Sequence, residues 1–469
     1  MTALETIIET HKKTDNITIN PATEEQIDCH HLQTSNEAQV LIEKAQEAFL
    51  SWREVEVSKR ADIIRKIAKS LANNKDCLAK MMTEEMGKPI SQSKSEVDVC
   101  IAICNYTADH CPERLQDEER PVEGGRGLIT YQPLGVILAI EPWNFPLYQV
   151  IRYSIPNLLA GNTSLLKHAK NVWGTGKLID KVFKQAGLPD GCFDLLFIEN
   201  EMVEDIIKDD RIRGVTLTGS AGAGRAVAKI AAENLKKSVL ELGGSDPYII
   251  LGDADINSAV KTCVQARLNN AGQTCVAAKR FIIVDEVYDK FRDRFKAIMS
   301  ASKYGDPEDT NTKLGPLARK DLRDDLHEQV KQSIAKGAQC ILGGEMPDGK
   351  GFFYPPTILE NVTPGMPAYD GELFGPVATL IRAKDEADAI RIANDHKYGL
   401  GGGIFTKDVD HGIDIARTKI DTGMMNVNGY NLALPNMPFG GVKESGYGRE
   451  HGGYGVREFV NIKSVVISE

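Results

Sequence analysis

The sequence lacks the features that mark membrane, secreted or nucleic-acid-binding proteins. No apolar run approaches the roughly 20 residues that a membrane-spanning helix needs. The N-terminus, Met1–Thr6, carries an acidic residue where a signal peptide needs a basic segment and an apolar core, so we expect no leader. No basic block offsets the net charge of −10, and this argues against a nucleic-acid binder.

Cysteine is present, but not in the patterns that disulfides or metals require. The nine cysteines form no CxxC pair and no Cys/His cluster at zinc spacing. We therefore expect reduced thiols in a cytoplasmic protein, with neither a disulfide framework nor a metal site. The adjacent His30 and His31 lie in a polar stretch without further ligands, so we expect them to be solvated surface residues.

Hydrophobic periodicity predicts more than one α/β unit, as the length of 469 residues requires. From about Thr34 to Cys111, apolar residues recur at helix spacing. From Leu134 to Leu242, short apolar runs alternate with helical patterns, which predicts a parallel sheet covered by helices on both faces. Among these elements we expect a strand over Phe193–Ile198 and a helix over Arg225–Lys236. A second α/β segment, from about Ser245 to Tyr430, follows without a linker.

Cys275 lies in a predicted connection between two elements. A helical pattern over Ile256–Leu268 is interrupted by Asn269–Gly272, and a strand-like run follows at Arg280–Val284. A thiol on a loop can meet a substrate, but cysteine is also among the most buried residue types, and spacing alone leaves a packing role open. Glu241 lies at the seam of the two segments, so we expect a site between the domains.

Two other loops carry groups suited to binding. The strand-like Gly214–Thr218 runs into a glycine-rich turn, Gly219–Gly224, that opens a helix and would aim backbone N–H groups at a diphosphate. The usual GxGxxG fingerprint after the first strand is absent, and tight packing is an alternative reason for the glycines. Asn144, between Pro142 and Pro146, is a rigid amide suited to donate to an oxyanion.

Seven motifs follow one another in a recognisable order: Pro142–Pro146, Lys167, Gly219–Ser220 with Gly224, Glu241–Gly244, Gly272–Cys275, Glu372–Pro376 and Pro438–Gly441. Their order and spacing resemble the aldehyde dehydrogenase superfamily over nearly the whole chain. More narrowly, Leu165–Ala169 and Cys275–Ile283 look like the bacterial NAD(P)-dependent succinate-semialdehyde dehydrogenases of the short type.

The resemblance implies an α/β fold with two doubly wound domains and a small β oligomerisation arm. Residues 1–115 and 133–243 would form the dinucleotide-binding domain and residues 244–445 the catalytic domain. Residues 116–132 and 446–469 would form the arm, in which Gly127–Tyr131 pairs with Val460–Ile467. The family then leads us to expect a homo-oligomer, either a dimer or a tetramer.

The resemblance also assigns catalytic and cofactor roles. The Cys275 thiolate would attack the aldehyde, with the oxyanion held by Asn144 and the Cys275 backbone N–H, and Glu241 would activate water to hydrolyse the thioester. A carboxylate at Glu241 favours hydrolysis over transfer to coenzyme A. The residues implied for binding NAD or NADP are Trp143, Lys167, Lys170, Gly219, Ser220, Gly224, Leu242, Glu372 and Phe374. Of these, Glu372 and Phe374 resemble the residues that place the nicotinamide ribose, and Lys167 resembles the one that bonds the adenosine ribose.

Two positions depart from the family pattern. Many NAD-preferring relatives have a glutamate where this chain has Lys170, and a cation there would attract a 2′-phosphate, so we expect NADP to be accepted; the alternative is a solvated lysine. Arg152 matches an arginine that binds the substrate carboxylate in related enzymes, although it could be a helix-surface residue. A second arginine is replaced by Asn269, and Phe439 completes the residues implied for substrate binding.

The sequence thus predicts an NAD(P)-dependent aldehyde dehydrogenase that oxidises succinic semialdehyde to succinate. Within the same class, the alternative is another aliphatic or ω-carboxylated aldehyde such as glutaric semialdehyde. A hydrolase that uses Cys275 and Glu241 without a nicotinamide is a rival from another class, and the glycine-rich turn argues against it. A non-catalytic binding protein is a further rival, which the intact Cys275, Glu241 and Asn144 disfavour.

Overall fold

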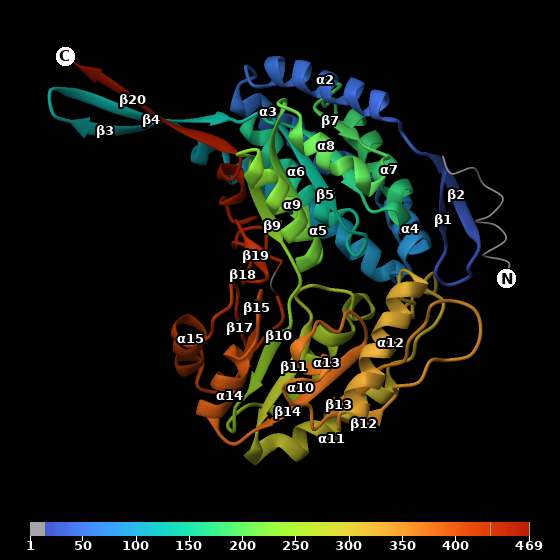
Figure 1. Ribbon diagram of the computed structural model, residues 1–469. Coiled ribbons are helices and arrows are strands. Elements are labelled where there is room, and N and C mark those ends of the chain that lie inside the picture. Colours follow the sequence, from blue (N-terminus) through green and yellow to red (C-terminus); the bar gives the residue numbers. More distant parts are fainter. Residues whose placement is uncertain (1–14, 432, 469) are drawn as a thin grey trace.

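A computed structural model describes residues 15–431 and 433–468 of the chain. Figure 1 shows two α/β bodies, one above the other, and an arm of three strands that projects from the upper body. The N-terminal segment Met1–Thr6, where we expected no leader, lies outside the described residues. None of the described helices is long and apolar enough to cross a membrane.

The predicted helical stretch from Thr34 to Cys111 is confirmed as four helices. The first begins with a capping box, in which the Thr34 backbone N–H donates to the Glu37 carboxylate at 2.7 Å and the Glu37 N–H donates to the Thr34 hydroxyl at 3.3 Å. A hairpin precedes these helices and a single 3₁₀ turn follows them: β1 (Asp15–Ile19), β2 (Gln26–His31), α2 (Ser35–Trp52), α3 (Val57–Asn73), α4 (Lys75–Met86), α5 (Ile90–His110) and η1 (Pro112–Leu115).

The upper body contains a six-stranded sheet in the order β19-β9-β8-β5-β6-β7. Five strands are parallel, as the alternating pattern predicted, and the edge strand β19 is antiparallel to β9. The bounds are β5 (Val136–Glu141), β6 (Thr163–His168), β7 (Phe193–Leu195), β8 (Ile212–Thr218), β9 (Lys237–Glu241) and β19 (Gly446–Tyr447).

Two boundaries in the upper body differ from the sequence-based expectation. The strand expected over Phe193–Ile198 ends at Leu195, because the Phe197 N–H donates to the Gln33 side chain at 2.9 Å instead of to a neighbouring strand. The helix expected from Arg225 begins at Ala221, because the Ser220 hydroxyl caps it. The elements between the strands are α6 (Tyr148–Ala160), η2 (Lys170–Val172), α7 (Trp173–Gln185), η3 (Asn200–Met202), α8 (Val203–Lys208) and α9 (Ala221–Glu233).

The lower body contains a seven-stranded sheet in the order β12-β13-β14-β11-β10-β16-β17, parallel except for β12. Its strands are β10 (Asp246–Ile250), β11 (Ala278–Val284), β12 (Gln339–Leu342), β13 (Thr357–Glu360), β14 (Val377–Ala383), β16 (Gly403–Phe405) and β17 (Asn426–Val427). Its helices are α10 (Ile256–Leu268), η4 (Asn269–Gly272), α11 (Asp285–Ala301), α12 (Lys320–Ala335), α13 (Pro367–Asp370), α14 (Glu386–Asn394) and α15 (Val409–Thr418). A two-stranded ladder joins β15 (Tyr398–Gly399) to β18 (Val442–Lys443).

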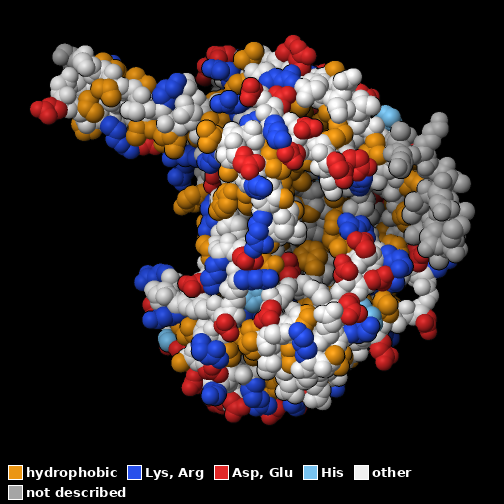
Figure 2. All heavy atoms as spheres, in the orientation of Figure 1, with side chains coloured by type: hydrophobic (Ala, Val, Ile, Leu, Met, Phe, Trp, Pro, Cys, Tyr) orange, Lys and Arg blue, Asp and Glu red, His pale blue; other side chains and the backbone are white. Residues whose placement is uncertain are grey.

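The arm is a three-stranded antiparallel sheet in the order β20-β4-β3, and it contains the strand pair that the sequence predicted. Gly127 pairs with Val466 and Tyr131 with Ile462. The arm strands and the preceding 3₁₀ turn are β3 (Glu118–Val122), β4 (Gly125–Pro133), η5 (Gly455–Arg457) and β20 (Val460–Ser468). Figure 2 shows hydrophobic side chains along this projecting arm.

The histidine pair behaves differently from the prediction. His31 is exposed, as expected for a solvated residue, but His30 is buried and its ring packs edge-on against Trp173, with 5.7 Å between the centroids. The error arose because consecutive strand residues point to opposite faces, so only one of two adjacent histidines on β2 can face solvent. Burial lowers the pKa of His30, which therefore stays neutral.

Candidate active site

Cys275 lies in the connection between α10 and β11, as the sequence predicted. Before it, Asn270 and Ala271 adopt left-handed backbone angles, with φ of +52° and +53°. Side-chain hydrogen bonds stabilise this uncommon turn, since the Asn270 amide donates to the Asn144 carbonyl at 2.8 Å and to the Gln273 carbonyl at 3.2 Å. The turn therefore ties the cysteine loop directly to the Asn144 loop.

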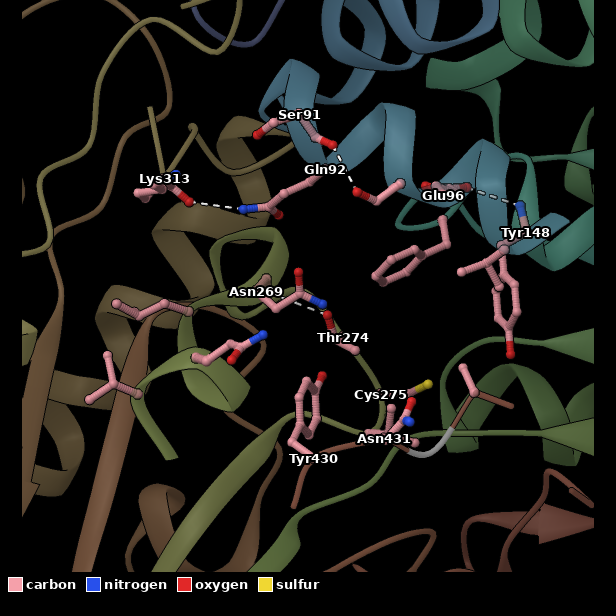
Figure 3. A pocket seen from close by; sticks show the side chains of 18 of the residues that line it. Ser91, Gln92, Glu96, Tyr148, Asn269, Thr274, Cys275, Lys313, Tyr430 and Asn431 are labelled. Carbon is pink, nitrogen blue, oxygen red and sulfur yellow. Dashed lines mark hydrogen bonds between the residues drawn. The ribbon is translucent and has the colours of Figure 1, made fainter. Parts of the chain in front are cut away.

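The Cys275 side chain lines a cavity of about 650 Å³ that α5, α6, α10 and the loop after β17 enclose. Figure 3 shows its sulfur directed into the cavity, toward the side on which Tyr148 lies. Burial raises the pKa of the Cys275 thiol to about 11, against the opposing charges of Arg152 and Lys279. The free protein thus holds a largely protonated thiol that faces a cavity of substrate size.

Asn144 follows β5 and is buried at the base of the cysteine loop. Its Nδ2 donates to the Gln273 carbonyl at 3.1 Å, two residues before Cys275. An amide carries two N–H donors, so a second remains for an oxyanion formed at the thiol. The structure therefore brings Asn144 to the cysteine loop.

Glu241 is the last residue of β9 and is 2% exposed. Neither of its carboxylate oxygens has a hydrogen-bond partner within residues 15–431 and 433–468. A Cβ on Gly440 would stand 2.7 Å from Glu241 Oε1, so the glycine leaves room for the carboxylate. Burial raises the pKa of Glu241 well above its ordinary value, and the charge of Arg152 opposes this rise. An unpaired carboxyl with a raised pKa suits a general base.

Arg152, expected in contact with the substrate carboxylate, lies behind the cavity wall and is 1% exposed. Its guanidinium forms an ion pair with Glu450 and donates to the Thr218 hydroxyl at 3.0 Å. The ring of Phe439, which does line the cavity, lies 4.5 Å from Arg152 Cζ. The helix-surface alternative is wrong, since all of α6 is buried, and the expected direct approach to the cavity is absent from this structure.

Asn269 and Phe439, the other two residues implied for substrate binding, both line the cavity. Figure 3 shows Asn269 on the wall near Gln92 and Lys313. The Gln92 amide donates to the Lys313 carbonyl at 3.0 Å. The cavity lining near Asn269 consequently presents neutral polar groups and two exposed lysines, Lys261 and Lys313, rather than an arginine.

The glycine-rich turn lies at the carboxyl edge of β8, where α9 begins. Gly219 donates its N–H to the Glu241 carbonyl at 3.0 Å, and the Ser220 hydroxyl accepts from the N–H of Ala223 at 3.2 Å. A Cβ on Gly224 would stand 2.6 Å from Leu242 Cδ1, so for this glycine the packing alternative holds. Gly222 and Ala223, in the first turn of the 13-residue helix, are exposed, which fits a diphosphate at its positive end.

The two lysines implied for the adenosine end lie after β6. The Lys167 side chain is largely buried, its ammonium has no hydrogen-bond or ion-pair partner in the described ranges, and burial lowers its pKa to about 8. Such an unpaired donor fits a ribose hydroxyl of a bound dinucleotide. Lys170 is half-exposed and pairs with Glu199, so its charge is shared instead of free.

The residues implied for the nicotinamide end lie between the two bodies. The Phe374 ring packs edge-on against Trp143, with 5.8 Å between the centroids. Glu372 accepts from the Gly244 N–H at 3.1 Å and pairs with Lys279 at 3.1 Å. The structure therefore connects Glu372 to the Glu241–Gly244 motif, although the two are far apart in the sequence.

Sequence reasoning missed Lys279 and Glu96. Lys279 is a charged residue within a strand whose residues are all buried, and this was a readable signal. Glu96 accepts from the N–H groups of Leu147 and Tyr148 at 3.0 and 2.9 Å, so it caps the helix that follows the Asn144 loop. Of the described residues, no three or more His, Cys, Asp or Glu side chains group in a way that would hold a metal ion.

These features define a class: two-domain α/β enzymes with a cysteine loop set against a dinucleotide-type sheet. The chain belongs to the aldehyde dehydrogenase family, whose model matches residues 7–465. It is 47% identical to a succinate semialdehyde dehydrogenase [NAD(P)+] of Escherichia coli over 96% of this chain and 97% of the relative. It is 43% identical to a succinate-semialdehyde dehydrogenase [NADP(+)] of Deinococcus radiodurans, over 96% and 94%.

A solved structure leads to the same family. A crystal structure of succinic semialdehyde dehydrogenase from Streptococcus pyogenes, in complex with NADP+, is similar with a TM-score of 0.94 and 38% sequence identity. The alignment covers 97% of this chain and all of that chain. The expected α/β aldehyde dehydrogenase fold is confirmed.

Proposed function

We propose that this chain oxidises succinic semialdehyde to succinate, with NAD or NADP as the hydride acceptor. The observation that carries the proposal is the Cys275 thiol, which faces a cavity of about 650 Å³ beside the Asn144 amide. Relatives at 43–47% identity bear the name succinate-semialdehyde dehydrogenase, and this supports the choice of substrate.

The first step is attack of Cys275 on the aldehyde carbon. The thiol gives its proton to water, a bond forms between Sγ and that carbon, and the electron pair of the broken carbonyl π bond makes the oxygen an oxyanion. The free Asn144 N–H and the Cys275 backbone N–H stabilise this charge. Burial raises the pKa of the thiol to about 11 and so disfavours the thiolate. The positive charges of Arg152 and Lys279 oppose this effect and stabilise the attacking thiolate.

NAD or NADP would lie along the carboxyl edge of the upper sheet. The α9 N-terminus, Lys167 and the Glu372–Phe374 pair are the groups that would hold it. When bound, the oxidised nicotinamide supplies the hydride acceptor that converts the thiohemiacetal to a thioester. Lys170 would favour a 2′-phosphate, while its partner Glu199 would oppose one, so we propose that both cofactors are used.

Glu241 completes the reaction by hydrolysing the thioester. Its carboxylate takes a proton from water, the resulting hydroxide attacks the acyl carbon, and the Cys275 thiolate leaves. No hydrogen bond from a described residue competes for the Glu241 oxygens. A carboxylate available for water favours release of a free acid.

A matrix of aldehydes against NAD and NADP tests the proposal, with absorbance of the reduced nicotinamide as the readout. We expect the highest kcat/KM for succinic semialdehyde, with turnover on both cofactors. Higher values for glutaric semialdehyde or an uncharged aldehyde would replace the substrate. Ester cleavage without any nicotinamide reduction would replace the enzyme class with a Cys/Glu hydrolase.

The arm supports a further proposal, that the chain forms a homo-oligomer. The β20 edge exposes Ile462 and Val466, at 62% and 64%, on strands that extend away from the core. Exposed apolar strand edges invite pairing with another copy. Light scattering should give a dimer or tetramer, and deletion of residues 460–469 should give a monomer.

All nine cysteines are free, which supports a cytoplasmic location.

A further inference from the structure

The Lys279 ammonium contacts both the loop that carries Cys275 and the carboxylate of Glu372, a residue implied for binding the cofactor. Lys279 is 2% exposed and stands four residues after Cys275, at the start of β11. Its Nζ lies 2.7 Å from the Cys275 carbonyl, 3.0 Å from the Thr274 carbonyl and 3.1 Å from Glu372 Oε1. A single buried cation therefore binds the main chain of the nucleophile and the carboxylate implied for the nicotinamide ribose.

The two glycines after Glu241 make room for this arrangement. A Cβ on Gly243 would overlap Glu372 Oε2, and a Cβ on Gly244 would stand 3.0 Å from the Cys275 carbonyl. The Gly244 N–H also donates to Glu372 Oε1 at 3.1 Å. Both partners of Lys279 thus lie against the segment that follows the general base, in a space that only glycine leaves open.

Asp246 is a second acid beside the same cation. It is buried on β10, and its Oδ1 accepts from the Gly401 N–H at 3.0 Å. Burial raises the pKa of Asp246 to about 7, and the positive charge of Lys279 opposes that rise. Lys279 therefore acts on two acids, the partly buried Glu372 and the buried Asp246, and its removal would leave Asp246 with only the weaker positive charge of Arg280 to oppose the effect of burial.

We propose that Lys279 is a positioning residue that holds the Cys275 loop and the Glu372 carboxylate in a defined position relative to each other. It holds the Cys275 main chain, and with it the N–H that faces the oxyanion, and it holds Glu372 in place for the nicotinamide ribose. The proposal rests on the proposed function, since Glu372 has a role only where a dinucleotide binds.

The charges around the thiol make this role measurable. Those that act on Cys275 are Arg152 from α6, Lys279 from β11, Glu372 from the loop before β14 and Asp246 from β10. Removal of Lys279 leaves one cation against two acids. The thiol then ionises less readily, and its reaction with an alkylating reagent slows at a fixed pH.

The test compares the full-length wild type with Lys279→Met and Lys279→Arg. Alkylation of Cys275 by iodoacetamide is followed between pH 7 and 9 without cofactor, and NADP binding is followed separately by fluorescence titration. We expect Lys279→Met to slow alkylation by about tenfold at each pH, one unit of thiol pKa, and to raise the Kd for NADP by about fivefold. Lys279→Arg, which keeps the charge, should recover most of the alkylation rate.

A double-mutant cycle measures the interaction between Lys279 and Glu372. In a Glu372→Gln background, Lys279→Met should change the NADP Kd by less than about twofold, because the contact is already weakened. Lys236→Met is the matched control, since Lys236 also donates to two main-chain carbonyls, those of Ile207 and Asp209, but far from the thiol along the chain. It should leave alkylation and NADP binding unchanged.

Three results would overturn the inference. The alkylation rate of Cys275 could be unchanged in Lys279→Met, or the effects of Lys279→Met and Glu372→Gln on the Kd for NADP could be additive. The third is that Lys236→Met lowers the alkylation rate and NADP binding as much as Lys279→Met does. If Lys279→Met does not fold, Lys279→Gln keeps a donor to the Cys275 carbonyl without the charge, and the same readouts apply. Neither readout uses an aldehyde, so a failure on succinic semialdehyde alone would count against the proposed function and not against Lys279. A wild type that does not bind NADP would count against both.

Discussion

Arg152 and Glu450 form a buried ion pair directly behind Phe439, a residue of the cavity wall. The pair gives Arg152 a structural partner that the sequence did not reveal. It also places a positive charge near the cavity without exposing it. A charge in such a dry environment still acts on a substrate carboxylate through its field.

The first prediction concerns this charge. Arg152→Met should lower kcat/KM for succinic semialdehyde by about tenfold more than for an uncharged aldehyde of the same length, because only the carboxylate senses the lost cation. Steady-state kinetics on the two substrates give the ratio. Equal losses would mean that Arg152 serves only to neutralise Glu450 and to favour the thiolate.

The second prediction concerns position 269, where related enzymes have an arginine and this chain has Asn269. Asn269→Arg places a guanidinium on the cavity wall, so we expect KM for succinic semialdehyde to fall by about fivefold. KM for an uncharged aldehyde should not fall. Asn269→Gln is the control of similar length without charge, and a similar gain in that variant would rule out a carboxylate contact.

The third prediction concerns cofactor choice at the Lys170–Glu199 pair. Glu199→Gln frees Lys170 and removes a negative charge near a 2′-phosphate, so the NADP to NAD ratio of kcat/KM should rise by about fivefold. Lys170→Ala should lower it. The exposed pair Lys208–Glu204 offers a control, because Glu204→Gln should leave the ratio unchanged.

The fourth prediction follows from the buried carboxyl of Glu241. Its pKa is raised above the ordinary value, and only the carboxylate accepts a proton from water, so turnover should fall as the pH falls through that raised pKa. Glu241→Gln should lose about a hundredfold in kcat while keeping a burst of about one reduced nicotinamide per site. Rapid mixing resolves the burst, whose absence would mean that Glu241 acts before hydrolysis.

The fifth prediction concerns stability beneath the Asn144 loop. Lys88 and Glu96 form a fully buried ion pair, and Glu96 also caps α6. Lys88→Met leaves an unpaired buried carboxylate, which costs about 3 kcal/mol in such pairs, so the midpoint of thermal unfolding should fall by several degrees. Replacement of both, as Lys88→Met with Glu96→Gln, should recover part of the loss. Circular dichroism is sufficient for both measurements.

Much of the fold was predictable because it depends on local periodicity. The alternating strands and helices from Val136 to Glu241 and the β4–β20 pair appear as expected. The sequence-based predictions were wrong where the outcome depends on a contact with a residue that is distant along the chain, because the local pattern does not reveal that residue. His30 is buried because it faces Trp173, and β7 is short because Gln33 binds the Phe197 N–H.

The sequence by itself determined the element types, the loop position of Cys275 and the order of the motifs, since each depends on neighbours along the chain. Only the tertiary structure decided which charges meet. It pairs Arg152 with Glu450 and Lys279 with Glu372, and it leaves Glu241 without a hydrogen-bond partner among the residues that the structure describes. The physical reason is that a buried charge must find its partner in space, and the chain brings together residues whose separation in sequence carries no signal.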